Sequence, residues 1–300
     1  MINKKWWKLT IQLEKEIEEL ILWKLHELRI FSFAFNYSKE EQNKLLLDIW
    51  LPKENWDQKA RNNLQEKLSV FLRQNGLSRI EFSWNLIKEE DWRESWKKYW
   101  GPSEIGNNLV VLPSWMKLPK EFCNKKVIKI DPGAAFGTGS HPSTSLCVEE
   151  IERNSVDQKK ILDIGSGSGI LTITAKLLGA SKLYALDIDS LACNSTAENF
   201  QLNFGNLDDL KIYEGEPLNF AKEDEFKDFD YIVCNILAGT IVNIIPTITS
   251  FLSNNGKVIL SGIITSQKEE IIKVLNLNKF EVVNVLSKNN WICINAKKLP

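Results

Sequence analysis

The stretch I-L-D-I-G-S-G-S-G-I-L, residues 161–171, decides the fold of this chain of 300 residues. A short apolar run leads into Gly165, Gly167 and Gly169 and then directly into a stretch with helical character. In a doubly wound α/β sheet such a turn lies at the carboxyl ends of the strands, where ligands bind, and glycine lets backbone approach a ligand closely. The turn predicts a nucleotide-like ligand, although strand-to-helix turns also use glycine for geometry alone.

Similar apolar runs recur on both sides of this turn, with helical stretches between them. Near-continuous apolar strands joined by helices are typical of a parallel sheet covered on both faces. We therefore predict a doubly wound α/β unit, in which the terminal hairpin of Phe280–Leu286 and Trp291–Asn295 adds an antiparallel strand at one edge. The runs assigned to the sheet are Val127–Ile130, Ile161–Ile164, Leu183–Leu186, Tyr231–Cys234 and Val258–Leu260.

The first part of the chain has a different character, because ten of the eleven tryptophans lie before residue 116. Its apolar residues recur every second position in some stretches, as in strands, and about every 3.6 positions in others, as in helices. The resulting order β-α-β-β-α-β is typical of a small α+β domain of the ferredoxin-like type. We expect one domain at 1–88 and a second, the doubly wound unit, at 126–300. A connector at 89–125 joins them, and its tryptophans Trp92, Trp96 and Trp100 follow helical spacing and are expected to pack between the domains.

Composition excludes several classes of protein. With 43% hydrophobic and 26% charged residues the chain is globular, and a net charge of -1 gives no global basic field for nucleic acid or anionic membranes. Two histidines and five cysteines without a C-x-x-C pair argue against a metal site. No leader and no membrane-spanning run is evident, so we expect a cytoplasmic protein without membrane or direct nucleic-acid binding.

The strand after the glycine turn ends in L-Y-A-L-D-I-D, which places Asp187 22 residues after Gly165. An acidic side chain at this spacing can accept hydrogen bonds from both ribose hydroxyls. The alternative is that Asp187 caps the helix beginning near Ser190, a task for which Asp189 is better placed. A nicotinamide dinucleotide is disfavoured, because Ile170 stands where G-x-G-x-x-G needs its last glycine.

Two further polar residues are expected at the same edge of the sheet. Asn235 closes the apolar strand D-Y-I-V-C-N, and Thr144 ends the glycine-rich segment D-P-G-A-A-F-G-T-G-S-H-P-S-T that begins at residue 131. Each has a local alternative, since Asn235 could cap the next helix and Thr144 could cap its own. His141 is expected to orient the segment rather than to act as a base.

These segments, together with N-I-L-A-G at 235–239 and L-S-G-I-I at 260–264, resemble the methyltransferases that modify large-subunit ribosomal protein eleven. The resemblance is clear over residues 131–300 and departs at Ser143 and Ser166, where threonine and cysteine are usual. It implies a class I methyltransferase fold with a mostly parallel seven-stranded sheet and S-adenosyl-L-methionine as cofactor. It also implies that residues 126–300 form the methyltransferase domain that binds this cofactor and that residues 1–88 form a substrate-recognition domain. The cofactor contacts taken from the resemblance and the motifs are Thr144, Gly165, Gly167, Asp187 and Asn235.

The resemblance also implies the reaction, which is methyl transfer to lysine ε-amines and to the N-terminal α-amine of protein eleven, met as a free protein before ribosome assembly. Asn235 is the candidate for positioning the amine, and no dedicated general base is evident. Two other functions stay open. One is a methyltransferase for RNA or a small molecule, and the other is a nonenzymatic protein that binds the adenosyl group.

Overall fold

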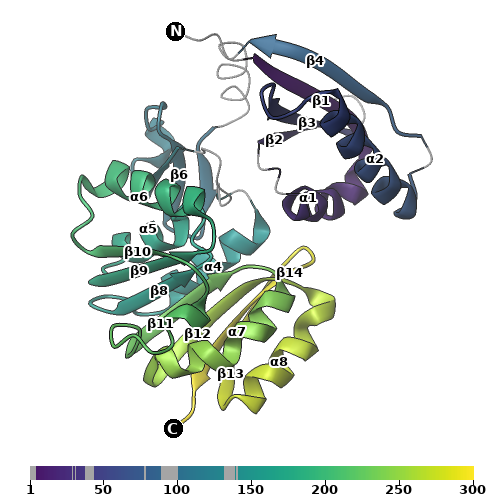
Figure 1. Cartoon of the computed structure of the whole chain (residues 1–300). Helices are drawn as coiled ribbons and strands as arrows, with labels where there is room; N and C mark the ends of the chain where they lie inside the picture. The colour runs from purple at the N-terminus through teal and green to yellow at the C-terminus, as the bar shows by residue number, and fades with distance from the viewer. Residues whose placement is uncertain are drawn as a thin grey trace. The chain divides into compact units, whose positions relative to one another are not determined.

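The chain divides at Gly101 into two units, each described here by itself (Figure 1). The computed structural model describes residues 5–28, 30, 32–37, 44–77, 79–88, 101–131, 139 and 141–300. Trp92, Trp96 and Trp100, which the sequence places in a connector, lie outside the described residues.

The first unit is built on an antiparallel sheet of four strands in the order β2-β3-β1-β4. Leu9, Ile11 and Leu13 alternate along β1 and are buried on one face, where leucines spaced by four residues on α2 complete the core. The elements follow the predicted order, as β1 (Lys5–Glu14), α1 (Glu18–Glu27), β2 (Phe33–Tyr37), β3 (Lys44–Pro52), α2 (Gln58–Gln74) and β4 (Phe82–Lys88), with a 3-10 turn at Lys15–Ile17.

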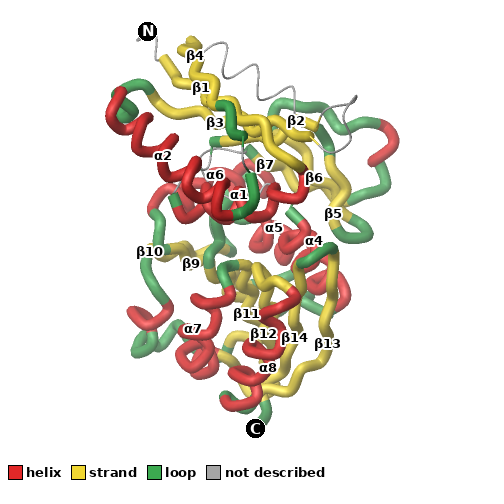
Figure 2. The backbone as a smooth tube through the Cα atoms, turned by 90° about the vertical axis from the view of Figure 1, so that its right-hand side faces the viewer, coloured by secondary structure: helices red, strands yellow, loops and turns green. Residues whose placement is uncertain are grey.

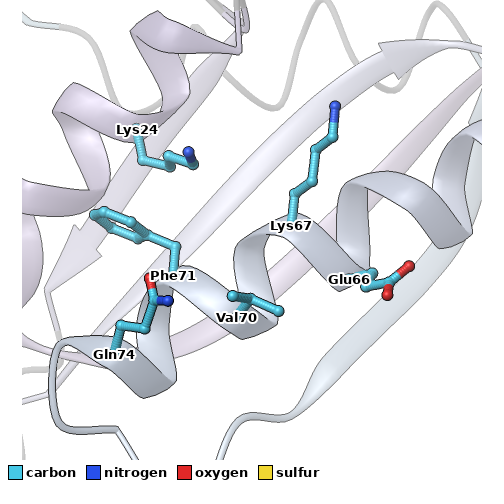
Figure 3. Close-up of a pocket in the computed structure, with 6 residues that line it drawn as sticks. All are labelled: Lys24, Glu66, Lys67, Val70, Phe71 and Gln74. Atoms are coloured by element: carbon cyan, nitrogen blue, oxygen red, sulfur yellow. The ribbon is translucent and has the colours of Figure 1, made fainter.

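A groove of about 290 Å³ lies between the two helices of this unit. Figure 3 shows Lys24 reaching from α1 toward Phe71 on α2, and the Lys24 ammonium stands 5.4 Å from the centre of that ring. The remaining lining residues all belong to α2 and are Glu66, Lys67, Val70 and Gln74. None of the residues that the sequence nominated for the cofactor lines this groove.

The second unit holds a sheet of seven strands in the order β10-β9-β8-β11-β12-β14-β13. Neighbouring strands are parallel except where β14 pairs with β12 and β13, so the large sheet is mostly parallel, as predicted. Its strands are β8 (Lys160–Ile164), β9 (Lys182–Asp187), β10 (Leu210–Glu214), β11 (Phe229–Asn235), β12 (Leu252–Ile264), β13 (Phe280–Lys288) and β14 (Trp291–Lys298).

Helices cover both faces of this sheet. One face packs against α4 (Pro142–Arg153), α5 (Ile170–Leu177) and α6 (Ser190–Phe204), and the other against α7 (Ala238–Phe251) and α8 (Lys268–Leu277). Figure 2 shows α7 and α8 beside the strands β11, β12, β14 and β13. Short 3-10 turns lie at Lys120–Phe122, Pro217–Phe220 and Thr265–Gln267. The three layers bury the central strands on both sides, which is why these strands read as continuous apolar runs.

Three details differ from the sequence-based expectation. Val127–Ile130 belongs to β7 (Lys126–Ile130), which lies in a separate small sheet with β6 (Leu109–Pro113) and β5 (Ser103–Ile105). The second unit begins at Pro102, so β5 and β6 belong to it although they fall inside the expected connector. Conversely, β10 was missed. Both β7 and β10 carry exposed residues among buried ones, so neither has the continuous apolar pattern of a central strand.

The terminal hairpin also differs in one respect. Its antiparallel strand β14 is not at the edge, because it pairs with β12 on one side and with the edge strand β13 on the other. The inner position goes to the more apolar strand, since Ile292, Ile294 and Ala296 of β14 are fully buried whereas β13 is largely exposed along its length. A hairpin pattern predicts that two strands pair with each other, but not which of the two also pairs with the rest of the sheet.

Candidate functional site

The glycine turn closes the buried strand β8 and opens α5 in the predicted manner. Gly165 and Gly169 have φ values of 74° and 79°, a left-handed conformation that favours glycine. A Cβ atom on Gly165 would lie 2.3 Å from the side chain of Ile236, and one on Gly169 would lie 3.1 Å from the Thr196 backbone. Backbone geometry alone therefore requires these glycines, and the resulting turn lies at the carboxyl edge of the parallel strands.

Asp187 ties the end of β9 to this turn. Its carboxylate accepts hydrogen bonds from the backbone N–H groups of Gly167 and Asp189, both at 3.0 Å. Burial raises the pKa of Asp187 above its usual value. The cap of α6 is Asp189, which accepts from the N–H of Leu191 at 3.0 Å. The alternative role of Asp187 as a helix cap is therefore filled by Asp189, and the remaining lone pairs of the Asp187 carboxylate are available to ribose hydroxyls.

Thr144 and Asn235 meet although they are 91 residues apart. The Asn235 amide nitrogen donates to the Thr144 hydroxyl at 3.1 Å, and Thr144 is fully buried. Neither residue caps a helix, because α7 has Leu237 at its N-cap without a side-chain bond and α4 is capped by His141. Both local alternatives are thus excluded, and the two predicted side chains form one polar pair at the end of β11.

His141 caps the beginning of α4. Its Nδ1 lies 2.7 Å from the Ser143 hydroxyl and accepts from the Ser143 N–H, while Pro142 occupies the first turn. The ring meets Trp291 edge to face with 4.6 Å between ring centroids. Most of the glycine-rich segment before it, residues 132–138 and 140, lies outside the described residues.

Sequence reasoning missed two residues of this region. Trp291, at the start of β14, is one, and its position as the single tryptophan after residue 115 was the available signal. Asp163, in the quoted motif two residues before Gly165, is the other. Its carboxylate accepts from both the N–H and the hydroxyl of Thr172, at 3.1 and 2.7 Å.

Asp163 is an unusual acid because it is completely buried. Desolvation raises its pKa to about 7, against the two hydrogen bonds from Thr172, which lower it, and the nearby Asp187 charge raises it further. The second carboxylate oxygen of Asp163 is buried without a hydrogen-bond partner. An acceptor of this kind below the glycine turn, together with Asp187, suits a ligand that brings hydroxyl donors and a positive charge. S-adenosylmethionine carries both, so the residues present fit this cofactor.

In the described part of the chain, no group of three or more histidine, cysteine or acidic side chains is arranged to hold a metal ion. Across those same ranges, no helix combines the length and apolar character needed to cross a membrane.

The parallel sheet with one inserted antiparallel strand, the glycine turn and an acidic residue at the end of the next strand define a class I methyltransferase. Comparison with known proteins agrees, because a family model described as ribosomal protein L11 methyltransferase matches residues 5–299. The chain belongs to this family, and its members are methyltransferases that use S-adenosylmethionine.

Three relatives illustrate the likeness. A ribosomal protein L11 methyltransferase of Prochlorococcus marinus (strain MIT 9515) is 53% identical over 294 residues, which is 98% of each chain. One of Synechococcus sp. (strain RCC307) is 34% identical and covers 98% of this chain and 97% of its own. The crystal structure of a ribosomal protein L11 methylase from Lactobacillus delbrueckii subsp. bulgaricus superposes with a TM-score of 0.61 and 32% identity, over 67% of this chain and 100% of that one.

Proposed function

We propose that this protein transfers methyl groups from S-adenosylmethionine to lysine ε-amines and to the N-terminal α-amine of ribosomal protein L11. The observation that carries the proposal is the Thr144–Asn235 pair, which lies at the end of β11 in the same sheet edge as the glycine turn and Asp187. We assign Asp187, Gly165 and Gly167 to holding the cofactor, and Thr144 and Asn235 to the region where cofactor and amine meet.

The acceptor nitrogen must be a neutral amine with a free lone pair. A lysine with a pKa of about 10.4 gives up its proton at pH 7 at a free-energy cost of roughly 4 to 5 kcal/mol. The Asn235 amide nitrogen already donates to Thr144, so the amide oxygen of the same side chain is left as an acceptor. That oxygen would accept an amine N–H and direct the lone pair, which contributes to catalysis through orientation.

When bound, S-adenosylmethionine supplies a methyl group on a sulfonium. The residues at the end of β11 would hold the neutral acceptor amine with its lone pair directed at that methyl group, and the proton released from the nitrogen would pass to solvent. The residues of this site act by binding and orientation, since none of the described side chains around Asn235 is placed as a general base. The carboxylate of Asp163 accepts two hydrogen bonds from Thr172 under the glycine turn.

We further propose the roles of the two units. Residues 1–88, whose four antiparallel strands and two helices have the order of a ferredoxin-like domain, recognise the substrate. The second unit, Pro102–Pro300, holds the cofactor. A net charge of -1 supports a protein substrate, met free before assembly, over direct binding to RNA. Five free cysteines support a cytoplasmic location.

The proposal is tested by incubating the full chain with radiolabelled S-adenosylmethionine and cognate ribosomal proteins or ribosomal RNA. Label in protein L11 is expected, and it should vanish with Asp187→Ala. The matched control is Asp189→Ala, which removes a helix cap two residues away. Label confined to RNA would instead support an RNA methyltransferase. Cofactor binding without any transfer would support a nonenzymatic adenosyl-binding protein.

A further inference from the structure

A buried carboxylate lies on the same helix as Thr144, six residues further along. Glu150 is 2% exposed, and no cation pairs with it in the described part of the chain. Burying an ionised carboxylate is unfavourable unless hydrogen bonds compensate for the lost water. A site in the interior of α4 occupied by glutamate rather than by leucine or valine therefore calls for a specific reason.

Three asparagine side chains supply the compensating hydrogen bonds. Amide nitrogens of Asn295 and Asn154 donate to one Glu150 oxygen at 2.7 and 3.1 Å, and that of Asn284 donates to the other at 2.8 Å. Asn154 also accepts from the Lys257 ammonium at 2.9 Å. The cluster thus joins α4 to β12, β13 and β14.

A bulge in the sheet brings one of these asparagines to the carboxylate. The pairing of β13 with β14 shifts by one residue between Val282 and Asn284, and beyond this bulge Asn284 stands directly opposite Asn295. A bulge commonly turns a side chain toward a particular partner. Here it brings the Asn284 amide to the same carboxylate as that of Asn295.

Along β14, three alternate residues face α4. Trp291 meets His141, Cys293 lies against Cys147, and Asn295 bonds to Glu150. The first two contacts are between aromatic rings and between thiols, and such contacts tolerate small displacements. Hydrogen bonds to a carboxylate weaken steeply with distance and angle, so the last contact is the one that specifies position.

We infer that Glu150 is a positioning residue for methyl transfer, which acts through α4 on Thr144. The inference rests on the proposed function, because Thr144 and Asn235 are assigned there to the meeting point of cofactor and amine. Six residues of α-helix span about 9 Å, so a rotation or slide of α4 at Glu150 reaches Thr144 almost undiminished. A displacement near 1 Å at a reacting centre can lower the rate roughly 100-fold.

The test compares full-length variants in steady-state methylation of protein L11. Glu150→Leu leaves the amides of Asn284 and Asn295 without their carboxylate acceptor, whereas the Asn154 amide keeps its bond to the Glu150 backbone carbonyl at 2.7 Å. We expect kcat to fall at least tenfold while KM for S-adenosylmethionine changes less than threefold. Glu150→Gln should retain kcat within about threefold, because its oxygen still accepts from Asn154 and Asn295, and the Asn284 amide can reverse. Glu149→Gln is the matched control on the neighbouring residue.

A triple variant separates position from stability. Glu150→Leu combined with Asn284→Leu and Asn295→Leu replaces the polar cluster by apolar packing, which often restores or increases stability. We expect the melting temperature to recover and kcat to stay low. Recovery of both would overturn the inference, as would a kcat that follows the melting temperature across all variants. Should the leucine variants at Glu150 not fold, Asn284→Leu, which removes one donor from a half-buried site, decides by the same criteria.

A second readout is independent of activity. The side-chain amide of Asn235 gives its own ¹⁵N–¹H NMR signals, whose shifts report its bond to Thr144. Glu150→Leu should move these signals and Glu149→Gln should not. If the parent protein methylated nothing, the proposed function would fail, yet the NMR comparison would still decide whether Glu150 positions Thr144.

Discussion

At the scale of single residues, the site depends on side chains whose surroundings fix their hydrogen-bonding roles. The Asn235 amide has one possible orientation while it donates to Thr144, and Asp187 has one while it accepts from Gly167 and Asp189. Polar groups held in this way lose little entropy when a ligand arrives, which favours both affinity and orientation.

The first prediction concerns the hydroxyl of Thr144. Thr144→Val keeps the shape of the side chain and removes the acceptor of the Asn235 amide, so that amide can rotate. We expect kcat to fall about tenfold, equivalent to roughly 1.4 kcal/mol, in a methylation assay. Thr249→Val is the control, because its hydroxyl bonds only to Ile245 within α7. Equal rates for the two variants would contradict an orienting role.

The second prediction is a pH dependence of stability from Asp163. The pKa of its carboxyl is about 7 in the folded chain and near 3.8 when exposed, so between these values the folded state binds the extra proton. Stability from this group is therefore lost as pH rises from about 4 to 7, by about 4 kcal/mol in total. Asp163→Asn should have nearly the parent's stability at pH 4 and be several kcal/mol more stable at pH 8.

Urea unfolding of the cofactor-free protein at several pH values checks this. The difference between Asp163→Asn and parent isolates Asp163 from the other titrating groups. A difference that stays constant from pH 4 to pH 8 would show that Asp163 is ionised throughout.

At the scale of secondary-structure elements, the turn between β8 and α5 tolerates little substitution of its glycines. It must reverse the chain within five residues, 165–169, and pass close to Ile236 and Thr196. At Gly165 and Gly169 the left-handed backbone and the close approach of Ile236 and Thr196 leave no room for a side chain.

The third prediction compares two glycines of the same unit. Gly165→Ala places a methyl group in a left-handed conformation and against Ile236, and it should destabilise the protein by at least about 1–2 kcal/mol and weaken cofactor binding. Gly239→Ala, in the first turn of α7 with nothing within 4 Å of its Cβ position, should be neutral or stabilising by up to about 1 kcal/mol. Denaturant unfolding and calorimetry with S-adenosylhomocysteine measure both effects.

At the scale of the whole molecule, each unit has a hydrophobic core of its own. One core gathers leucines and isoleucines of the first unit, and two others lie on the two faces of the large sheet. Every residue assigned to the cofactor belongs to the second unit, Pro102–Pro300.

The fourth prediction follows from this division. A fragment of residues 102–300 should fold and bind S-adenosylhomocysteine within about threefold of the full chain, but it should methylate protein L11 at least 100-fold more slowly. Calorimetry and a methylation assay measure the two quantities on the same preparation. Full activity of the fragment would show that the first unit does not recognise the substrate.

Local patterns in the sequence are sufficient to predict much of the fold and several residues of the candidate site. The glycine turn, Asp187 and the parallel strands follow from spacings of a few to some twenty residues, because strand and helix periodicity reports which face of an element is buried. The β-α-β-β-α-β order of the first unit follows for the same reason. Thr144 and Asn235 are each predicted from the sequence, but only as single residues that also have a local alternative.

The tertiary structure alone decided which distant partners meet. Asn235 bonds to Thr144 across 91 residues and Glu150 to Asn295 across 145, and it is β14 rather than β13 that pairs with β12. The burial that shifts the pKa of Asp163 likewise depends on what packs above it. The periodicity of apolar residues indicates that one face of a helix or strand is buried, but not which element packs against it. The packing of all layers together decides which elements meet.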